Sequence, residues 1–271
     1  MRGLLCAALA VGCAGGPPVL ARGSLAYDVA AAGDLVASIE LETEFALVLR
    51  RAGKATRVTL GPPEHDFVAL DVDAAGRVAA VAGLDGTVRL HDAVTGRERA
   101  RWRLDAPATA VAVSRDGTLV ATGAASGVLC LRRVDDGALL HCVAEHSRRI
   151  TALAAGKELL VSADAGGALV VWTLPALRVV LRRHEDTPIA AIALSADEKR
   201  VALAGPPVTA VAFAGDRVAT AEKGRVRIGE RAIDGFPGEL RGLATAGGWL
   251  YVAGFTGADL RGASITALRL P

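Results

Sequence analysis

Apolar residues recur in short runs along the whole chain, and within each run they alternate with polar positions as they do in half-buried β-strands. One run, of the form apolar-x-x-apolar-x-apolar, returns six times, starting at Ala26, Phe67, Ala108, Ile150, Ile189 and Val208. The first three starts are 41 residues apart, and the next two steps are 42 and 39 residues. This regular spacing predicts a repeated supersecondary unit.

Each copy leads through a polar turn into a second apolar strand, and in the clearest copies another hairpin follows. Residues 87–104 and 128–143 are such hairpins, with turns at Thr95-Gly96 and Asp136-Gly137. Glycine and aspartate supply the positive φ angles that tight hairpins need. Four short strands in roughly 40 residues are typical of a propeller blade. The pattern therefore predicts an all-β chain that forms a single β-propeller of four-stranded antiparallel blades.

The repeat is irregular in two places. Between Ile189 and Val208 only two strands fit, because Gly205-Pro206-Pro207 follows where a second hairpin would begin, and proline is excluded from central strands. The sequence therefore predicts seven angular positions with one truncated blade, or alternatively six blades with an extra hairpin. The last unit, residues 239–254 and 264–270, has only three strands, so we expect a strand from the N-terminal side to close the ring.

The composition fits one folded domain and limits the classes of partner that the chain is expected to bind. Apolar residues make up 52% of the 271 residues and charged residues 22%, which is enough apolar material to bury a core. The 31 basic and 29 acidic residues are spread along the chain, so the charge pattern predicts no nucleic-acid binding. The sequence contains no Asn and no Gln, which removes the N-glycosylation motif and the side-chain amides used in metal sites and oxyanion holes.

The N-terminus differs in character from the rest. The apolar run from Leu4 to Val11 predicts an export leader at residues 1–21, followed by the propeller at residues 22–271. Two processing sites compete: a lipobox-like segment at which Cys13 would be lipidated, and cleavage after Ala21. Either predicts an exported protein, periplasmic or an outer-membrane lipoprotein. The alternatives are that Val19 to Arg22 is retained and pairs against the last blade, and that the protein is cytoplasmic. No segment is long and uncharged enough to predict a transmembrane helix.

The repeats resemble those of the WD-repeat family. Residues 83–92, GLDGTVRLHD, are similar to a characteristic segment of that family, with His91 in place of the usual Trp. His residues a few positions upstream of three first strands echo its Gly-His element. The resemblance covers roughly residues 25–271, although Val81 and Ser126 replace the family's Ser and Asp. It implies a structural hydrogen-bonded set within the blades, with the members His146, Ser162, Asp164, Trp172, His65, Asp85 and His184.

The same resemblance implies a non-catalytic scaffold, a monomeric ring that binds a protein partner and carries no cofactor. Four arginines flank the His residues of connections that lie, in WD propellers, on the usual docking face: Arg148, Arg149, Arg182 and Arg183. They predict a basic rim for an acidic partner. Glu145, Glu185 and Asp186 lie beside them, and the alternative is ordinary solvated loop charge.

No catalytic or nucleotide-binding motif is present. The alternative function is a metal-dependent propeller hydrolase or a small-ligand-binding protein that uses the central channel. Enzymes that resemble lactonases hold calcium there with Glu, Asp and Asn, so this chain would depend on carboxylates such as Glu40, Glu42 and Glu64.

Cys130 and Cys142 stand on the two strands of one predicted hairpin. If residues 135–137 form a three-residue loop, residue 134 faces residue 138 and the two cysteines face each other, within reach of a disulfide. An exported protein would favour the oxidised form. Two small buried thiols are the alternative. With His141 beside them, these cysteines lack the spacing of a zinc site, so we expect no metal.

Overall fold

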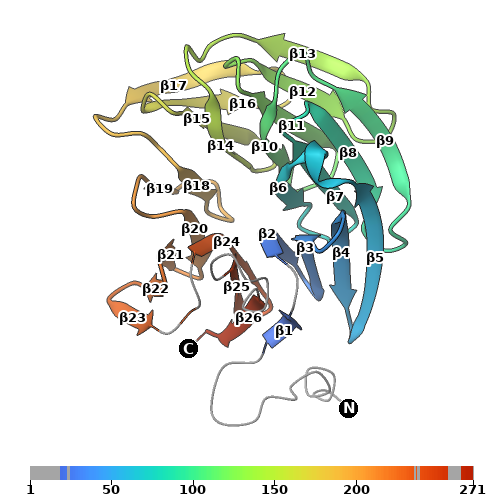
Figure 1. Cartoon of the computed structure of the whole chain (residues 1–271). Helices are drawn as coiled ribbons and strands as arrows, with labels where there is room; N and C mark the ends of the chain where they lie inside the picture. Colours follow the sequence, from blue (N-terminus) through green and yellow to red (C-terminus); the bar gives the residue numbers. More distant parts are fainter. Residues whose placement is uncertain (1–18, 23–24, 235, 237–238, 256–263, 271) are drawn as a thin grey trace.

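The computed structural model describes residues 19–22, 25–234, 236, 239–255 and 264–270. In these ranges the chain forms seven antiparallel sheets, arranged as the blades of a ring (Figure 1), and the ring encloses a central channel. The described residues include no helix that is long and apolar enough to cross a membrane.

Five of the seven blades consist of four consecutive strands each, running in order from the channel to the rim. Blade 1 contains β2 (Leu25–Ala32), β3 (Leu35–Leu41), β4 (Phe45–Arg51) and β5 (Lys54–Gly61). After the short 3-10 helix η1 (Pro63–His65), blade 2 contains β6 (Phe67–Val72), β7 (Val78–Gly83), β8 (Thr87–Asp92) and β9 (Glu98–Arg103). Blade 3 contains β10 (Ala108–Val113), β11 (Leu119–Ala124), β12 (Leu129–Arg133) and β13 (Leu139–Val143). Blade 4 contains β14 (Ile150–Ala155), β15 (Leu159–Asp164), β16 (Ala168–Thr173) and β17 (Arg178–His184).

Blade 5 has only two strands, β18 (Ala191–Leu194) and β19 (Val201–Ala204). The chain then passes through Gly205-Pro206-Pro207 directly to blade 6, which contains β20 (Ala210–Ala214), β21 (Arg217–Glu222), β22 (Arg225–Ile228) and β23 (Arg231–Asp234). Omitting a whole hairpin leaves β19 ending on the ring face where β20 must begin, so the order of the blades is preserved. The predicted arrangement of seven positions with one truncated blade is confirmed.

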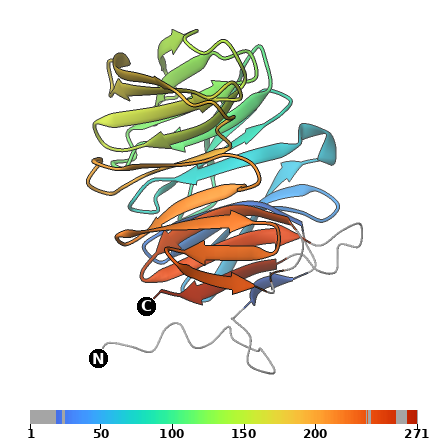
Figure 2. The ribbon, with the colours of Figure 1, turned by 90° about the vertical axis from the view of Figure 1, so that its left-hand side faces the viewer.

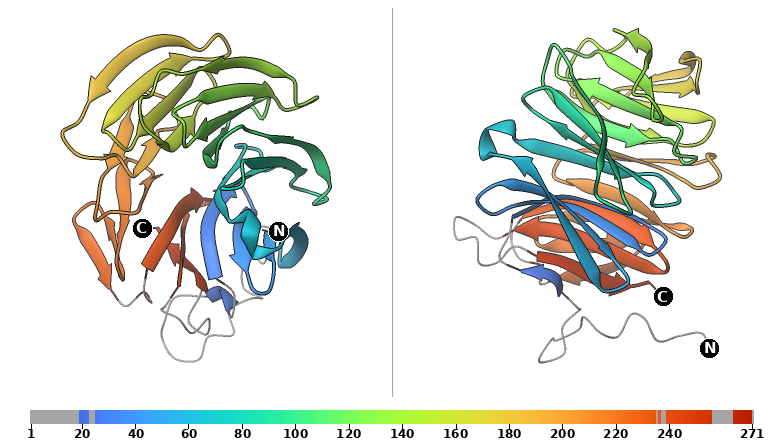
Figure 3. Two further views of the ribbon diagram at one scale, coloured as in Figure 1. Left: turned by 45° about the horizontal axis from the view of Figure 1, so that its top comes forward. Right: turned by 90° about the vertical axis from the view of Figure 1, so that its right-hand side faces the viewer.

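Blade 7 is assembled from both ends of the chain. Its inner strands are β24 (Glu239–Ala246), β25 (Trp249–Phe255) and β26 (Ser264–Arg269), and its outermost strand is β1 (Val19–Arg22) (Figure 3). β1 runs antiparallel to β26, with Val19 opposite Thr266 and Arg22 opposite Ser264. The closing strand expected from the N-terminal side is therefore present. Residues 1–18, including Cys13, lie outside the described residues, and cleavage after Ala21 would remove most of β1.

The innermost strands contact one another around the whole ring, from β2 through β6, β10, β14, β18 and β20 to β24 and back to β2. Apolar side chains pack between the blades; Phe45 of blade 1 and Phe67 of blade 2, for example, are fully buried in one cluster. Alanine is the commonest residue on the channel walls, and its small side chain allows the sheets to approach closely where they converge.

Threonines on three innermost strands tie neighbouring blades together. Each occupies the second position of the repeat that starts at Ala108, Ile150 or Val208. The Oγ1 atoms of Thr109, Thr151 and Thr209 donate hydrogen bonds to main-chain oxygens of the next blade, at 2.6, 2.5 and 2.5 Å. Because the same position makes the same bond in three copies, the sequence repeat extends to the contacts between blades.

Candidate functional site

The clearest side-chain network lies in blade 4, where the structure brings together four predicted residues. His146, in the connection before β14, lies with Nδ1 3.1 Å from Asp164 Oδ2 and with Nε2 2.7 Å from Ser162 Oγ. Trp172 Nε1 donates to the same hydroxyl oxygen at 2.9 Å. All four side chains are buried. The network therefore fixes the connection between blades 3 and 4 against the sheet of blade 4.

Blade 2 retains half of this network. His65 Nδ1 lies 2.7 Å from Asp85 Oδ2, and Thr87 donates to the same carboxylate. Burial raises the pKa of Asp85, but the hydrogen bonds from Thr87 and His65 outweigh it and hold that pKa below its usual value. His91, where the family has Trp, is buried and contacts the carbonyl oxygen of Gly96 at 3.1 Å, and burial lowers its pKa.

His184, the third histidine predicted to belong to such a hydrogen-bonded set, does not take part in one. It is exposed at the end of β17, so it belongs to a strand and not to the connection that follows. Blade 5 has no third strand to carry a partner equivalent to Trp172. A hydrogen-bonded set around His184 therefore does not form in the part of the chain that the structure describes.

The four predicted rim arginines lie on the connection face, the ring face on which the chain passes from one blade to the next, as at residues 144–149. Arg182 and Arg183 are part of β17 and point to opposite sides of its sheet, because they pair with Val170 and Leu169 in succession. Both are ion-paired: Arg182 Nε lies 2.5 Å from Glu145 Oε1, and Arg183 Nε lies 2.6 Å from Glu185 Oε1.

Arg148 and Arg149 differ from that pair. Both are exposed, and neither forms an ion pair with any described residue. The stem of Arg148 packs against Gly166 in the β15–β16 turn, which Asp164 holds by accepting the N–H of Gly166 at 2.8 Å. The structure thus presents these two arginines on a braced connection and leaves Arg182 and Arg183 partly neutralised beside them.

The central channel has a volume of about 1380 Å³ and five aspartates line it; Asp28 and Asp71, on the innermost strands β2 and β6, are half-buried. Asp28 Oδ2 accepts the N–H of Leu70 in the next blade at 3.0 Å. Asp71 Oδ2 accepts the N–H of Val113, again in the next blade, at 2.8 Å. Burial raises the pKa of Asp28 to about 7 and that of Asp71 to about 6. Both carboxyl groups therefore serve to join neighbouring blades.

The three glutamates considered as calcium ligands for the alternative function lie elsewhere. Glu40, Glu42 and Glu64 are not among the residues that line the channel. Glu40 is buried within blade 1, where its carboxylate accepts hydrogen bonds from Arg50 and Ser38, each at 2.6 Å. In the described ranges, no group of three or more His, Cys, Asp or Glu residues could hold a metal ion. The calcium prediction from these three glutamates is therefore wrong for the channel.

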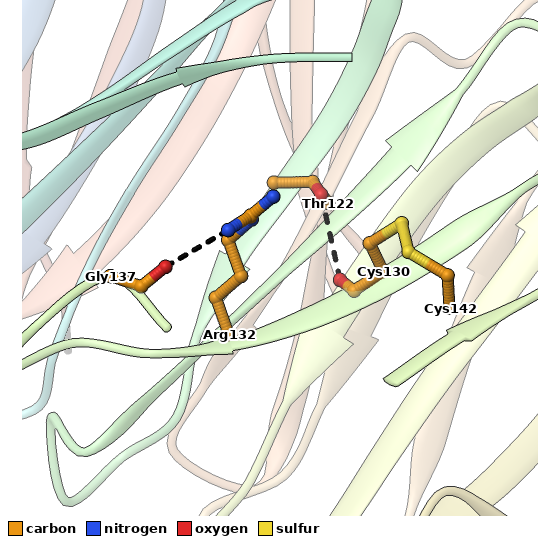
Figure 4. The surroundings of a disulfide bond; sticks show 5 residues. All are labelled: Thr122, Cys130, Arg132, Gly137 and Cys142. Carbon is orange, nitrogen blue, oxygen red and sulfur yellow. Dashed lines mark hydrogen bonds between the residues drawn. A yellow bond between two sulfur atoms is a disulfide. The ribbon is translucent and has the colours of Figure 1, made fainter. Parts of the chain in front are cut away.

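Cys130 and Cys142 form a disulfide between the two outer strands of blade 3 (Figure 4). They are direct partners in the β12–β13 ladder. The predicted turn was wrong in detail: Arg133, not residue 134, pairs with Ala138, and a bulge between Leu131 and Arg132 shifts the register by one. The bulge offsets the shorter register of the turn, so the predicted pairing of the cysteines still results.

The sequence patterns did not reveal Asp28 and Asp71. In the aligned strands every other copy carries Ala or Gly at the position of Asp28, and Ala at the position of Asp71. A lone acid among alanines on the innermost strand was the available signal. Nothing in the spacing shows that such an acid reaches the main chain of the next blade.

Comparison with known proteins identifies the fold. No protein-family model and no curated protein sequence matches the chain. Solved structures do match. A chain of the crystal structure of the mitotic checkpoint complex has a TM-score of 0.76 at 13% sequence identity, covering 91% of this chain and 86% of that chain. The structure of U3-55K has a TM-score of 0.77 at 15% identity, covering 94% of this chain and 100% of that chain. The fold is therefore a WD40-like β-propeller.

Proposed function

We propose that this chain is a non-catalytic scaffold that binds another protein on the outer surface of the ring. The observation that carries the proposal is the structural role of two aspartates in the channel, Asp28 and Asp71. Asp28 and Asp71 accept main-chain hydrogen bonds from neighbouring blades, so they maintain the ring instead of converging on a substrate. The mitotic checkpoint complex, to which the fold is similar, is an assembly of proteins by its name, which is consistent with this role.

The docking surface proposed here is the connection face at blade 4, centred on Arg148 and Arg149. These exposed cations stand on a connection braced by the buried network of His146, so they are held in place before a partner arrives. Two adjacent unpaired arginines favour an acidic partner surface.

The protein is proposed to act outside the cytoplasm, at the cell envelope. The Cys130–Cys142 disulfide supports an oxidising compartment. The apolar leader predicted at residues 1–21 supports export. Mass spectrometry of the native N-terminus tests this directly, since it separates a lipidated Cys13 from a chain starting at Arg22 and from an unprocessed chain.

The scaffold role is tested by crosslinking the tagged ring in envelope extract and quantifying the captured proteins. We expect an acidic protein to be enriched by the wild type and lost from the double variant Arg148→Glu/Arg149→Glu. The matched control is Arg97→Glu/Arg178→Glu, which reverses two exposed arginines near the opposite face that form no ion pair with the described residues. Capture that survives the first variant would refute the docking surface, and tight calcium binding in calorimetry would favour the enzyme alternative.

A further inference from the structure

The truncated blade leaves a notch in the side of the ring. Blades 4 and 6 each carry two strands outside their second strand, whereas blade 5 ends at β19 (Figures 1 and 2). With strands about 4.8 Å apart, the edge of β19 lies roughly 10 Å inside the rim that its neighbours reach. The notch therefore has a floor, the edge of β19, and two walls, the facing sides of blades 4 and 6.

The floor is a strand edge without a partner in the described chain. β19 pairs only with β18, and Ser195 N–H donates to the carbonyl oxygen of Arg200 at 2.9 Å. Because hydrogen-bonded and non-hydrogen-bonded pairs alternate along antiparallel strands, the N–H and C=O groups of Val201 and Leu203 point away from β18. These groups can pair with one further strand.

The wall formed by blade 4 presents an exposed leucine, Leu181, with Arg183 on the same side of the strand. Leu181 of β17 lies opposite Val171, whose side chain belongs to the cluster that packs blade 4 against blade 5. Leu181 is 50% exposed and Val201 on the floor 38%. They are two of the five large apolar side chains exposed in the described chain, and a complete blade 5 would cover this side of the sheet.

The wall formed by blade 6 is polar and basic. In β22, Val226 and Ile228 are buried toward blade 7. Arg225 and Arg227 alternate with them along the strand and therefore point toward the notch. Arg225 is ion-paired with Asp234 at 2.5 Å. Arg227 is exposed and forms no ion pair with a described residue.

We propose that the edge of β19 accepts an extended segment of a protein partner as an additional antiparallel strand, whose side chains alternate between apolar and acidic. Residues opposite Val201 and Leu203 would point toward Leu181, and the residues between them toward Arg227. This inference rests on the proposed function only in that the ligand is a protein, because the notch and the connection face of blade 4 are different surfaces. The recessed floor favours a flexible segment over a second copy, because another folded ring could not reach the edge.

Fluorescence anisotropy with a labelled peptide of six alternating Val and Glu residues tests the proposal. We expect saturable binding, and no binding of a peptide with the same residues arranged as a Val block and a Glu block. Leu181→Lys and Arg227→Glu should each weaken binding roughly tenfold or more. Val94→Lys is the matched control, since Val94 is 61% exposed outside the notch, and it should leave binding unchanged. Hydrogen exchange should slow at the amides of Val201 and Leu203 when the peptide binds.

Several outcomes would overturn the proposal. The first three are absence of binding by the alternating peptide, equal binding of both peptides, and an equal loss of binding in the Val94→Lys control. The fourth is a dimer in sedimentation that Leu181→Lys abolishes, since such a dimer would make a second copy the occupant. Arg148→Glu/Arg149→Glu should not change peptide binding, and Leu181→Lys should not change capture at the connection face. Failure of one surface is thereby distinguished from failure of the other.

Discussion

Gly156, in the turn between β14 and β15, provides a quantitative test of how blade 5 is held in the ring. Blades 2, 3 and 5 have a polar side chain at this point of the repeat, such as Asp73, whose carboxylate accepts the N–H of Arg77 at 2.6 Å. Blade 4 has glycine, and Glu198 of blade 5 supplies the acceptor instead. Its carboxylate accepts the N–H of Lys157 at 2.6 Å, of Glu158 at 3.1 Å and of Leu159 at 2.8 Å.

Replacing Gly156 with alanine should displace this carboxylate. A Cβ atom at this position would lie 2.2 Å from Glu198 Cδ and 2.3 Å from its Oε2, far inside van der Waals contact. The side chain of Glu198 would have to leave, and its bonds to three main-chain N–H groups would be lost. Because these bonds are charge-assisted but largely exposed to solvent, we take their combined value as about 2 kcal/mol. In a domain of this size, that corresponds to a melting temperature about 4–8 °C lower.

Differential scanning calorimetry of a double-mutant cycle measures this interaction. Glu198→Ala alone should cost about as much as Gly156→Ala alone. In the Glu198→Ala background the clash is gone, and Gly156 has no positive φ, so Gly156→Ala should be neutral or slightly stabilising. If Gly156→Ala melts like the wild type, or costs the same in both backgrounds, the reasoning is refuted.

Three further predictions concern the closing strand, the channel and blade 4. A chain that begins at Arg22 should melt well below the wild type, whereas a chain that begins at Val19 should not, because only the former removes most of β1; equal melting by circular dichroism would contradict this. Burial raises the pKa of Asp28 to about 7, so this carboxyl stabilises the fold less as the pH rises from about 4 to 7. The melting temperature of Asp28→Asn relative to the wild type should therefore rise between pH 5 and pH 8, and a flat difference would count against the shift. Ser162→Ala removes a hydroxyl that accepts from Trp172 and contacts Nε2 of His146, two buried groups, and should cost about 2–4 kcal/mol in urea unfolding, against little for Thr122→Ala in blade 3, whose hydroxyl has one bond at 3.5 Å; equal costs would argue against the network.

The strands and the irregularities of the ring were predictable from the sequence because they follow from alternation within one blade. The two prolines after Gly205 predicted the short blade, and the missing strand of the last unit predicted β1. The pairing of Cys130 with Cys142 was predicted with the wrong turn, and a bulge restored it.

Contacts between blades were not predictable in the same way. Asp28 and Glu198 each accept main-chain N–H groups of a neighbouring blade. Such bonds depend on the rise and rotation between sheets, which a repeat period does not encode. Arg182 and Arg183 are adjacent in sequence, so they look like one basic feature, but a strand places them on opposite sides of its sheet.

These contacts explain how half a blade can remain in the ring. On one side Thr151 donates to the carbonyl oxygen of Ile189 at 2.5 Å, and Glu198 caps the turn of blade 4. On the other side Arg200 donates to the main-chain oxygen of Asp216 in blade 6 at 3.1 Å. All of these bonds involve the two inner strands or their turn, so the outer hairpin is not needed to hold blade 5 in position. An outer edge that does not maintain the ring is free to pair with another chain. Because Glu198 holds blade 5 in position from outside the notch, Glu198→Ala should weaken peptide binding at β19.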